Sequence, residues 1–146
     1  KTLGSGKLNR KIMNWYLKVL KQYADFSGRA RRKEYWMFTL FNIIFGGIAI
    51  WLDNFLGIAF KGIGYIIDQG NVDLSPGPLY GIYALILFIP GLAVVIRRLH
   101  DIGKSGWMIL VTLIPFIGAI WILVLMLTDS KPGKNQYGEN PKEVTL

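Results

Sequence analysis

The chain has 146 residues, of which 52% are hydrophobic and 14% aromatic, and its mean hydropathy is +0.36. A soluble domain is about 45–50% apolar even when glycine is counted, so this chain is more apolar than a soluble core requires. The absence of cysteine and the single histidine exclude disulfides, thiolate metal sites and multi-histidine metal sites. We therefore expect an all-α integral membrane protein without a metal or other cofactor.

The first 12 residues, KTLGSGKLNRKI, differ in character from the rest of the chain. They are polar, they contain a Gly-Ser-Gly triplet, and they precede Met13, which resembles a natural start. We interpret residues 1–12 as an added leader or a disordered extension. We expect residues 13–143 to form a single membrane domain.

Residues 13–25 have the pattern of a short amphipathic helix. Polar side chains, including Lys18 and Lys21, recur along one face, and apolar and aromatic side chains cover the remainder. Two interpretations stay open. The helix lies in the membrane interface, with Trp15 as an anchor, or it packs against the protein's own membrane helices.

Three uncharged apolar runs predict three membrane-spanning helices, over residues 35–52, 79–96 and 107–127. Eighteen helical residues extend over about 27 Å, close to the ~30 Å thickness of the hydrocarbon core. The stretch 55–67 is broken by Lys61 and by glycines, so we expect a re-entrant or interfacial segment, with a fourth span as the alternative. The aromatic residues at the ends of the runs are expected interfacial anchors: Tyr35, Trp36, Trp51 and Trp107.

The distribution of lysine and arginine predicts the orientation. With three spans, the N-terminal segment and the second loop share a side that carries 13 of these residues, and the opposite side carries four. The positive-inside rule then places the N-terminus in the cytoplasm and the C-terminus outside. Because the cations flank apolar runs, we expect contact with the bilayer and not with nucleic acid.

Two basic clusters would then lie on the cytoplasmic face. The first consists of Arg29, Arg31, Arg32 and Lys33 followed by Glu34, and the second consists of Arg97, Arg98, His100 and Lys104 around Asp101. We hypothesise that their cations bind an anionic lipid head group or another anion, and that the two acidic residues form structural ion pairs with arginine. The alternatives are charges that only fix the orientation, and a surface for a protein partner.

The sequence offers no catalytic constellation, so we predict no catalytic residue and do not expect an enzyme. His100 titrates near neutral pH, but no residue near it has the context of an activated nucleophile. We expect a membrane-embedded binding or accessory protein. The alternative is a subunit of a small transporter or channel, and a homo-oligomer or another membrane protein is compatible with either function. No predicted span contains an ionisable residue, which disfavours an ion-coupled transporter made of one chain.

Four motifs resemble those of the family catalogued as domain of unknown function 805, which includes the YhaH- and YhaI-like bacterial inner-membrane proteins. They are GRARRKEYW (28–36), RRLHDIGKSGW (97–107), LIPFIG (113–118) and GKNQYGENP (133–141). The resemblance implies a small, multi-span, helical protein of the bacterial cytoplasmic membrane, and it carries no established activity. Under the three-span topology the last motif lies outside. We therefore expect it to form a separate structural cap, away from the basic clusters.

Overall fold

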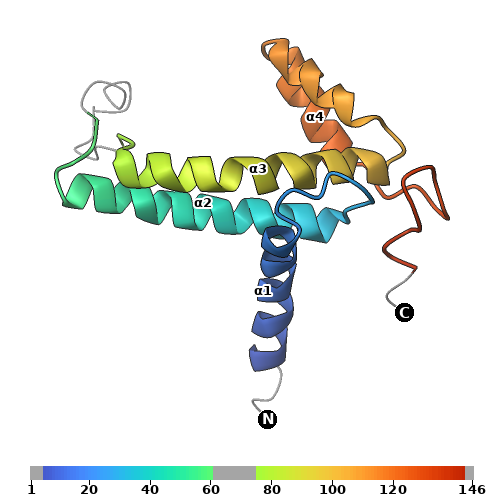
Figure 1. The fold of residues 1–146 in the computed structure, drawn as a ribbon, viewed down its shortest axis with the longest axis horizontal. Coiled ribbons are helices and arrows are strands. Elements are labelled where there is room, and N and C mark those ends of the chain that lie inside the picture. The colour runs from blue at the N-terminus through green and yellow to red at the C-terminus, as the bar shows by residue number, and fades with distance from the viewer. Residues whose placement is uncertain (1–4, 61–74, 144–146) are drawn as a thin grey trace. The chain divides into compact units, whose positions relative to one another are not determined.

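The computed structural model describes residues 5–60 and 75–143, and every regular element within these ranges is helical (Figure 1). The elements are α1 (Ser5–Lys21), α2 (Arg32–Phe55), α3 (Pro78–Asp101), the 3₁₀ helix η1 (Gly106–Leu113) and α4 (Ile117–Leu127). The expectation for residues 55–67 falls mostly outside the described residues.

Two of the described helices, α2 and α3, are long and apolar enough to cross a membrane. Each has 24 residues and extends over about 36 Å, more than the ~30 Å of the hydrocarbon core. They contain the first two predicted spans, 35–52 and 79–96, and continue beyond both ends of each. Their additional residues place Arg32 and Lys33 at the start of α2, and Arg97, Arg98 and His100 at the end of α3.

The chain divides into two compact units. Unit 1 consists of Lys1–Phe38 and Pro90–Leu146, and unit 2 consists of Thr39–Ile89. The start of α2 and the end of α3 therefore belong to unit 1, and the remainder of both helices belongs to unit 2.

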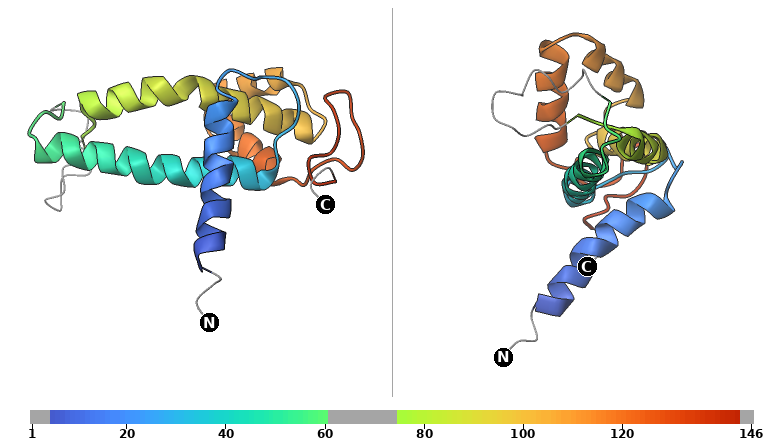
Figure 2. Two further views of the ribbon diagram at one scale, coloured as in Figure 1. Left: turned by 60° about the horizontal axis from the view of Figure 1, so that its bottom comes forward. Right: turned by 90° about the vertical axis from the view of Figure 1, so that its left-hand side faces the viewer.

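Within unit 2, the segments of α2 and α3 lie side by side (Figures 1 and 2). The Tyr83 hydroxyl donates a hydrogen bond of 2.7 Å to Oδ1 of Asn42. Gly46 lies against the ring of Tyr80, which would be 3.4 Å from an added Cβ. Large apolar side chains on both helices remain exposed, as expected of surfaces that face lipid: Ile43, Ile48, Trp51, Phe55, Ile82, Leu85 and Phe88.

The apolar core of unit 1 lies where α3, η1 and α4 meet. Leu99 of α3 packs with Leu125 and Met126 of α4, and all three are buried. Residues of the first turn of α2 and of η1 surround them, including Tyr35 and Met108. This core holds the end of α3 against η1 and α4.

The third helix predicted over residues 107–127 is not a single helix in the structure. Instead η1 and α4 fold back on one another as a hairpin (Figure 2). Pro115 has no N–H to continue a helix, and Phe116 adopts a positive φ of 61° at the turn. Gly118 permits the close approach of the arms, because an added Cβ would overlap the carbonyl of Val111.

The amphipathic helix predicted over residues 13–25 corresponds to α1, which begins at Ser5 and ends at Lys21. Tyr16 and Val19 are buried within unit 1, and the Tyr16 ring stacks on Phe38 with 5.6 Å between centroids. Met13 and Leu17 on the same helix are exposed. The helix thus packs against the protein and also presents apolar side chains outward.

Candidate functional site

The opening of the motif RRLHDIGKSGW is the end of α3, which closes with a glycine cap. Gly103 has a φ of +75°, a conformation that favours glycine. Its N–H donates to the carbonyl of His100 at 3.0 Å, and the N–H of Lys104 donates to the carbonyl of Leu99 at 2.9 Å. These two bonds are those of a Schellman motif, so the chain reverses here without leaving the last carbonyls of α3 unpaired.

The remainder of the motif starts the hairpin. Ser105 is the N-cap of η1, where its Oγ accepts a bond from the N–H of Trp107 at 3.4 Å. Gly106 lies against α3, since an added Cβ would be 2.8 Å from Cγ2 of Ile96. Ser105 therefore has a structural role.

Five charged side chains form a buried ionic cluster beside this turn: Arg29, Glu34, Arg97, Arg98 and Asp101. Burying charges is costly unless each one is paired and hydrogen-bonded. Each carboxylate meets two cations, because Glu34 binds Arg97 at 2.8 Å and Lys18 at 2.6 Å, whereas Asp101 binds Arg29 at 3.0 Å and also Arg98. The cluster is therefore a set of shared ion pairs.

Asp101 is the centre of the larger half of this cluster. Its carboxylate accepts from Nε of Arg29, from Nη1 of Arg98 and from the hydroxyl of Ser130, the last at 2.6 Å. Its main-chain carbonyl accepts from Nη2 of Arg29 at 3.2 Å and from the N–H of Lys131 at 3.0 Å. One residue thus joins α3 to the segment before α2 and to the C-terminal tail.

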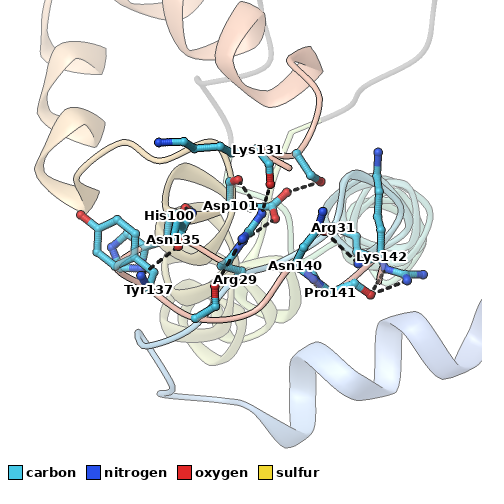
Figure 3. Close-up of polar contacts among 12 residues, drawn as sticks. Arg29, Arg31, His100, Asp101, Lys131, Asn135, Tyr137, Asn140, Pro141 and Lys142 are labelled. Atoms are coloured by element: carbon cyan, nitrogen blue, oxygen red, sulfur yellow. Dashed lines mark hydrogen bonds and ion pairs between the residues drawn. The ribbon is translucent and has the colours of Figure 1, made fainter. Parts of the chain in front are cut away.

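Arg29 uses all five of its N–H groups on protein acceptors (Figure 3). Besides its two bonds to Asp101, it donates to the carbonyls of Lys131 at 2.6 Å, Gly133 at 2.7 Å and Gly138 at 3.3 Å. A guanidinium that is buried and fully hydrogen-bonded has no donor left for a ligand. Arg29 is therefore a connector between segments of the chain.

Three further arginines bind the end of α4 or the tail. Arg31 donates to the carbonyl of Pro141, with Nε at 2.8 Å, and Arg32 donates to the carbonyl of Leu127 at 3.0 Å. Arg98 donates to the carbonyl of Thr128, and the tail residue Asn135 donates in return to the carbonyl of His100 at 2.9 Å. The expectation that the tail motif is a cap separate from the basic clusters is therefore wrong.

The tail can reach the cluster because the hairpin returns the chain to the end of α3. A single helix over residues 107–127 would instead have carried residues 133–141 away from the end of α3. The two arms of the hairpin bring them back, so three of the four motifs meet in one place.

His100 is held by packing. Its ring stacks on Tyr137, with 3.7 Å between centroids and 3° between planes, and its Nδ1 lies 3.3 Å from the carbonyl oxygen of Gly28 (Figure 3). Within residues 5–60 and 75–143, no group of three or more acidic or histidine side chains has a metal-binding arrangement. The observed geometry favours a structural role for His100.

The predicted site residues divide by exposure. Arg29, Arg97 and Arg98 are buried, Arg31 and Arg32 are partly exposed, and Lys33 and Lys104 are exposed. Asp101 binds Arg98 and not Arg97, whereas Arg97 binds Glu34 across to α2. The structure thus brings the arginines of both clusters together but leaves the lysines at the surface.

A third buried carboxylate, Asp53 in unit 2, was not singled out by the sequence. It accepts from the N–H groups of Gly77 at 3.0 Å, Leu79 at 3.0 Å and Tyr80 at 2.9 Å. These three N–H groups lie at the start of α3, so Asp53, near the end of α2, caps the N-terminus of α3. The available signal was an isolated aspartate after an apolar run, with the turn-forming residues 75–78 before the next run.

Comparison with known proteins identifies the family. Residues 23–139 match the family described as "Protein of unknown function (DUF805)". The chain is 47% identical over 130 residues to Inner membrane protein YhaH of Escherichia coli strain K12, which covers 89% of this chain and 98% of that protein. It is 44% identical over 130 residues to Inner membrane protein YhaI of the same strain, covering 89% and 97%.

A more distant relative is Uncharacterized protein YiiR of the same strain, 26% identical over 145 residues that cover 82% of this chain and 88% of that protein. No solved structure matches the chain. The two long apolar helices agree with the names of the closer relatives. The chain is a helical membrane protein and belongs to the DUF805 family.

Proposed function

We propose that this protein is an inner-membrane binding or accessory protein whose cytoplasmic face gathers anionic phospholipids around exposed lysines. The observation that carries the proposal is the segregation of charge. Of the 17 lysines and arginines, 16 lie in residues 1–33, 97–104 and 131–142, and only Lys61 lies in the connection between α2 and α3. The contacts of Arg29 and Asp101 join these three segments.

This arrangement supports a topology with two spans, α2 and α3, and with both termini in the cytoplasm. The tail contacts the end of α3, so it shares a side with the basic clusters and not the opposite side that a third span requires. Positive charge then concentrates on one side more strongly than in the three-span prediction. The positive-inside rule assigns that side to the cytoplasm.

The lysines are better placed than the arginines to meet head groups. Lys21, Lys33, Lys104 and Lys131 are exposed, and none has a carboxylate partner within the ranges that the structure describes. Each cation near an anionic membrane surface contributes about 1 kcal/mol, so the four together contribute roughly 4 kcal/mol. That is enough to select neighbouring lipids, whereas the apolar helices already anchor the protein.

The buried ionic cluster acts in this proposal as a framework. Its arginines are buried and bind carboxylates, and Arg29 and Arg98 also bind tail carbonyls, which fixes the surface on which the lysines stand. The hypothesis of a composite head-group site therefore changes from the arginines themselves to the lysine surface around them.

The test compares lipid enrichment around the wild-type protein with that around two quadruple variants. The protein is placed in nanodiscs of phosphatidylethanolamine and phosphatidylglycerol, and co-purifying lipids are counted by native mass spectrometry. Replacing Lys21, Lys33, Lys104 and Lys131 by Gln is expected to abolish the preference for phosphatidylglycerol. Replacing all four by Arg is expected to preserve it.

The preference is also expected to weaken as salt rises, because exposed charges are screened over about 8–10 Å at 0.1–0.15 M ionic strength. A Gln variant that retains the wild-type enrichment would overturn the proposal. So would a wild-type protein that shows no enrichment at low salt.

A further inference from the structure

The hairpin of η1 and α4 is apolar on every side. Residues 106–127 contain no charged residue. Trp107 is 79% exposed, Leu113 77%, Phe116 85% and Ile117 67%, so both arms and the turn present large apolar side chains outward. Such a surface is unfavourable in water and requires an apolar partner.

The length of the hairpin fits half of a bilayer. The eight residues of η1 extend over about 16 Å at ~2.0 Å per residue. The 11 residues of α4 extend over about 16 Å at ~1.5 Å per residue. Each arm is therefore about half as long as the ~30 Å hydrocarbon core is thick. The hairpin fits within one leaflet, and neither arm is long enough to span the bilayer.

Both ends of the hairpin are fixed beside the end of α3. Ser105 comes directly after the glycine cap of α3, and at the other end Arg98 binds the carbonyl of Thr128. The base of the hairpin packs on Leu99 and Val95, which precede the end of α3. The hairpin therefore begins at the polar end of α3 and lies beside the apolar turns that precede this end. It extends in the direction of the membrane interior.

The turn satisfies many of its own backbone groups, as a segment in hydrocarbon must. The N–H of Ile114 donates to Val111 at 3.0 Å, and the N–H of Gly118 donates to Ile114 at 2.9 Å. Pro115 has no N–H to satisfy. The hydroxyl of Thr112 donates within its own arm, to the carbonyl of Ile109 at 2.6 Å.

We propose that residues 106–127 form a re-entrant hairpin that inserts only into the leaflet bearing the exposed lysines, and that its partner is the acyl chains of that leaflet. The inference goes beyond the proposed function, because it requires no preference among head groups. It implies a protein that occupies more area in one leaflet than in the other. Such one-sided insertion is the physical basis of sensitivity to lipid packing and curvature.

The first arm of the test is sidedness. The chain has no cysteine, so single cysteines at Ser105, Gln136 and Asn71 can be labelled with a membrane-impermeant maleimide. We expect label at position 71 in intact cells. We expect label at positions 105 and 136 only in inverted membrane vesicles. Label at position 136 in intact cells would overturn the proposal, because residues 106–127 would then cross the bilayer.

The second arm is depth and the identity of the partner. Spin labels on cysteines at Leu110, Phe116 and Val124 in liposomes are compared for collisions with oxygen and with a water-soluble nickel chelate. We expect the label at Phe116 to be deepest, with high access to oxygen, and the other two to be shallower. Equal, shallow depths would indicate a hairpin lying on the surface, and low oxygen access at all three would indicate a second copy; either result overturns the proposal.

The two proposals fail separately. A Gln variant that retains the wild-type lipid enrichment overturns the proposed function without changing sidedness or depth. A spanning segment 106–127 overturns the hairpin and moves Lys131 to the other side, but leaves Lys21, Lys33 and Lys104 in place. The combined results therefore identify which proposal is wrong.

Discussion

Asp101 and Asp53 are both fully buried carboxylates, but they are stabilised in different ways. Asp101 in unit 1 binds two arginines and a serine, whereas Asp53 in unit 2 accepts three backbone N–H groups at the start of α3. No cation pairs with Asp53 among the residues that the structure describes. Asp101 and its arginines fix three segments of the chain, and Asp53 closes one connection between two helices.

The chemistry of the partners explains the difference. A guanidinium carries five donors in a plane, so Arg29 can bind Asp101 and the tail carbonyls at once. Backbone N–H groups at a helix N-terminus carry partial positive charge, which suits one carboxylate and extends no further. The arginine-based site thus organises the face that we propose to be functional, and the amide-based site only stabilises the α2–α3 hairpin.

The largest effect is expected from Asp101→Asn. The variant keeps the shape of the side chain but leaves Arg29 and Arg98 buried without their counter-charge, a change that typically costs about 3–5 kcal/mol. The measurement is thermal unfolding in detergent, monitored by circular dichroism. The matched control is Glu139→Gln, which removes an exposed pair of 3.4 Å with Lys134 and is expected to cost less than about 1 kcal/mol. Equal unfolding temperatures for Asp101→Asn and Glu139→Gln would contradict the account.

A smaller effect is expected from Gly77→Ala, which tests the Asp53 site. The added Cβ would be 2.6 Å from Cγ of Asp53, whose three bonds leave it no freedom to move. Overpacking of this kind costs about 1–3 kcal/mol. Gly81→Ala, near the start of α3, is the control, because nothing lies within 4 Å of its added Cβ, and alanine favours a helix by up to about 1 kcal/mol. Both variants are measured by thermal unfolding in detergent. Equal unfolding temperatures for Gly77→Ala and Gly81→Ala would contradict the role given to Asp53.

The smallest effect is expected from Asp129, an exposed carboxylate with cationic partners. A hydrogen bond from Lys142, together with a weaker contribution from the N–H of Ser130, holds the pKa of Asp129 below its ordinary value. A lowered pKa in the folded state adds stability above the ordinary pKa of aspartate, and this stability is lost as the pH falls through the lowered value. Solvent screens the pair, so the contribution is small.

The measurement for Asp129 is the difference in unfolding temperature between the wild type and Asp129→Asn from pH 7 down to pH 2. We expect a small difference at neutral pH that vanishes as the pH falls. A difference that grows on acidification would have the wrong sign.

The sequence predicted α2 and α3 well, because long uncharged runs have few alternatives to a membrane helix. It did not predict the hairpin, since the 21 uncharged residues 107–127 have the composition of a span and of a re-entrant hairpin alike. Pro115 and Gly118 were the local signals, but proline and glycine are also tolerated within a membrane helix. The three-span topology also places every residue after 127 on the side opposite the second loop, which is why the tail motif was separated from the basic clusters.

The buried ion pairs were partly predictable from residue type. Pairing of Glu34 and Asp101 with arginine was expected, but the choice of Arg98 over Arg97 for Asp101 depends on how α3 is turned toward the tail. Arg29 as a connector to carbonyls was not predictable, because backbone acceptors leave no mark in the sequence. Asp53 was overlooked because a lone acidic residue has the same pattern whether it is buried or exposed.

The central claim is that the tail motif meets the basic clusters on one face of the protein, and a cross-link tests it most directly. The rings of His100 and Tyr137 are stacked, so cysteines at both positions of the cysteine-free chain lie within reach of a short bis-methanethiosulfonate reagent. In native membranes we predict an intramolecular cross-link, identified by mass spectrometry and absent from each single variant. If both cysteines react with a monofunctional reagent yet no cross-link forms, the tail does not join the cluster and the account is contradicted.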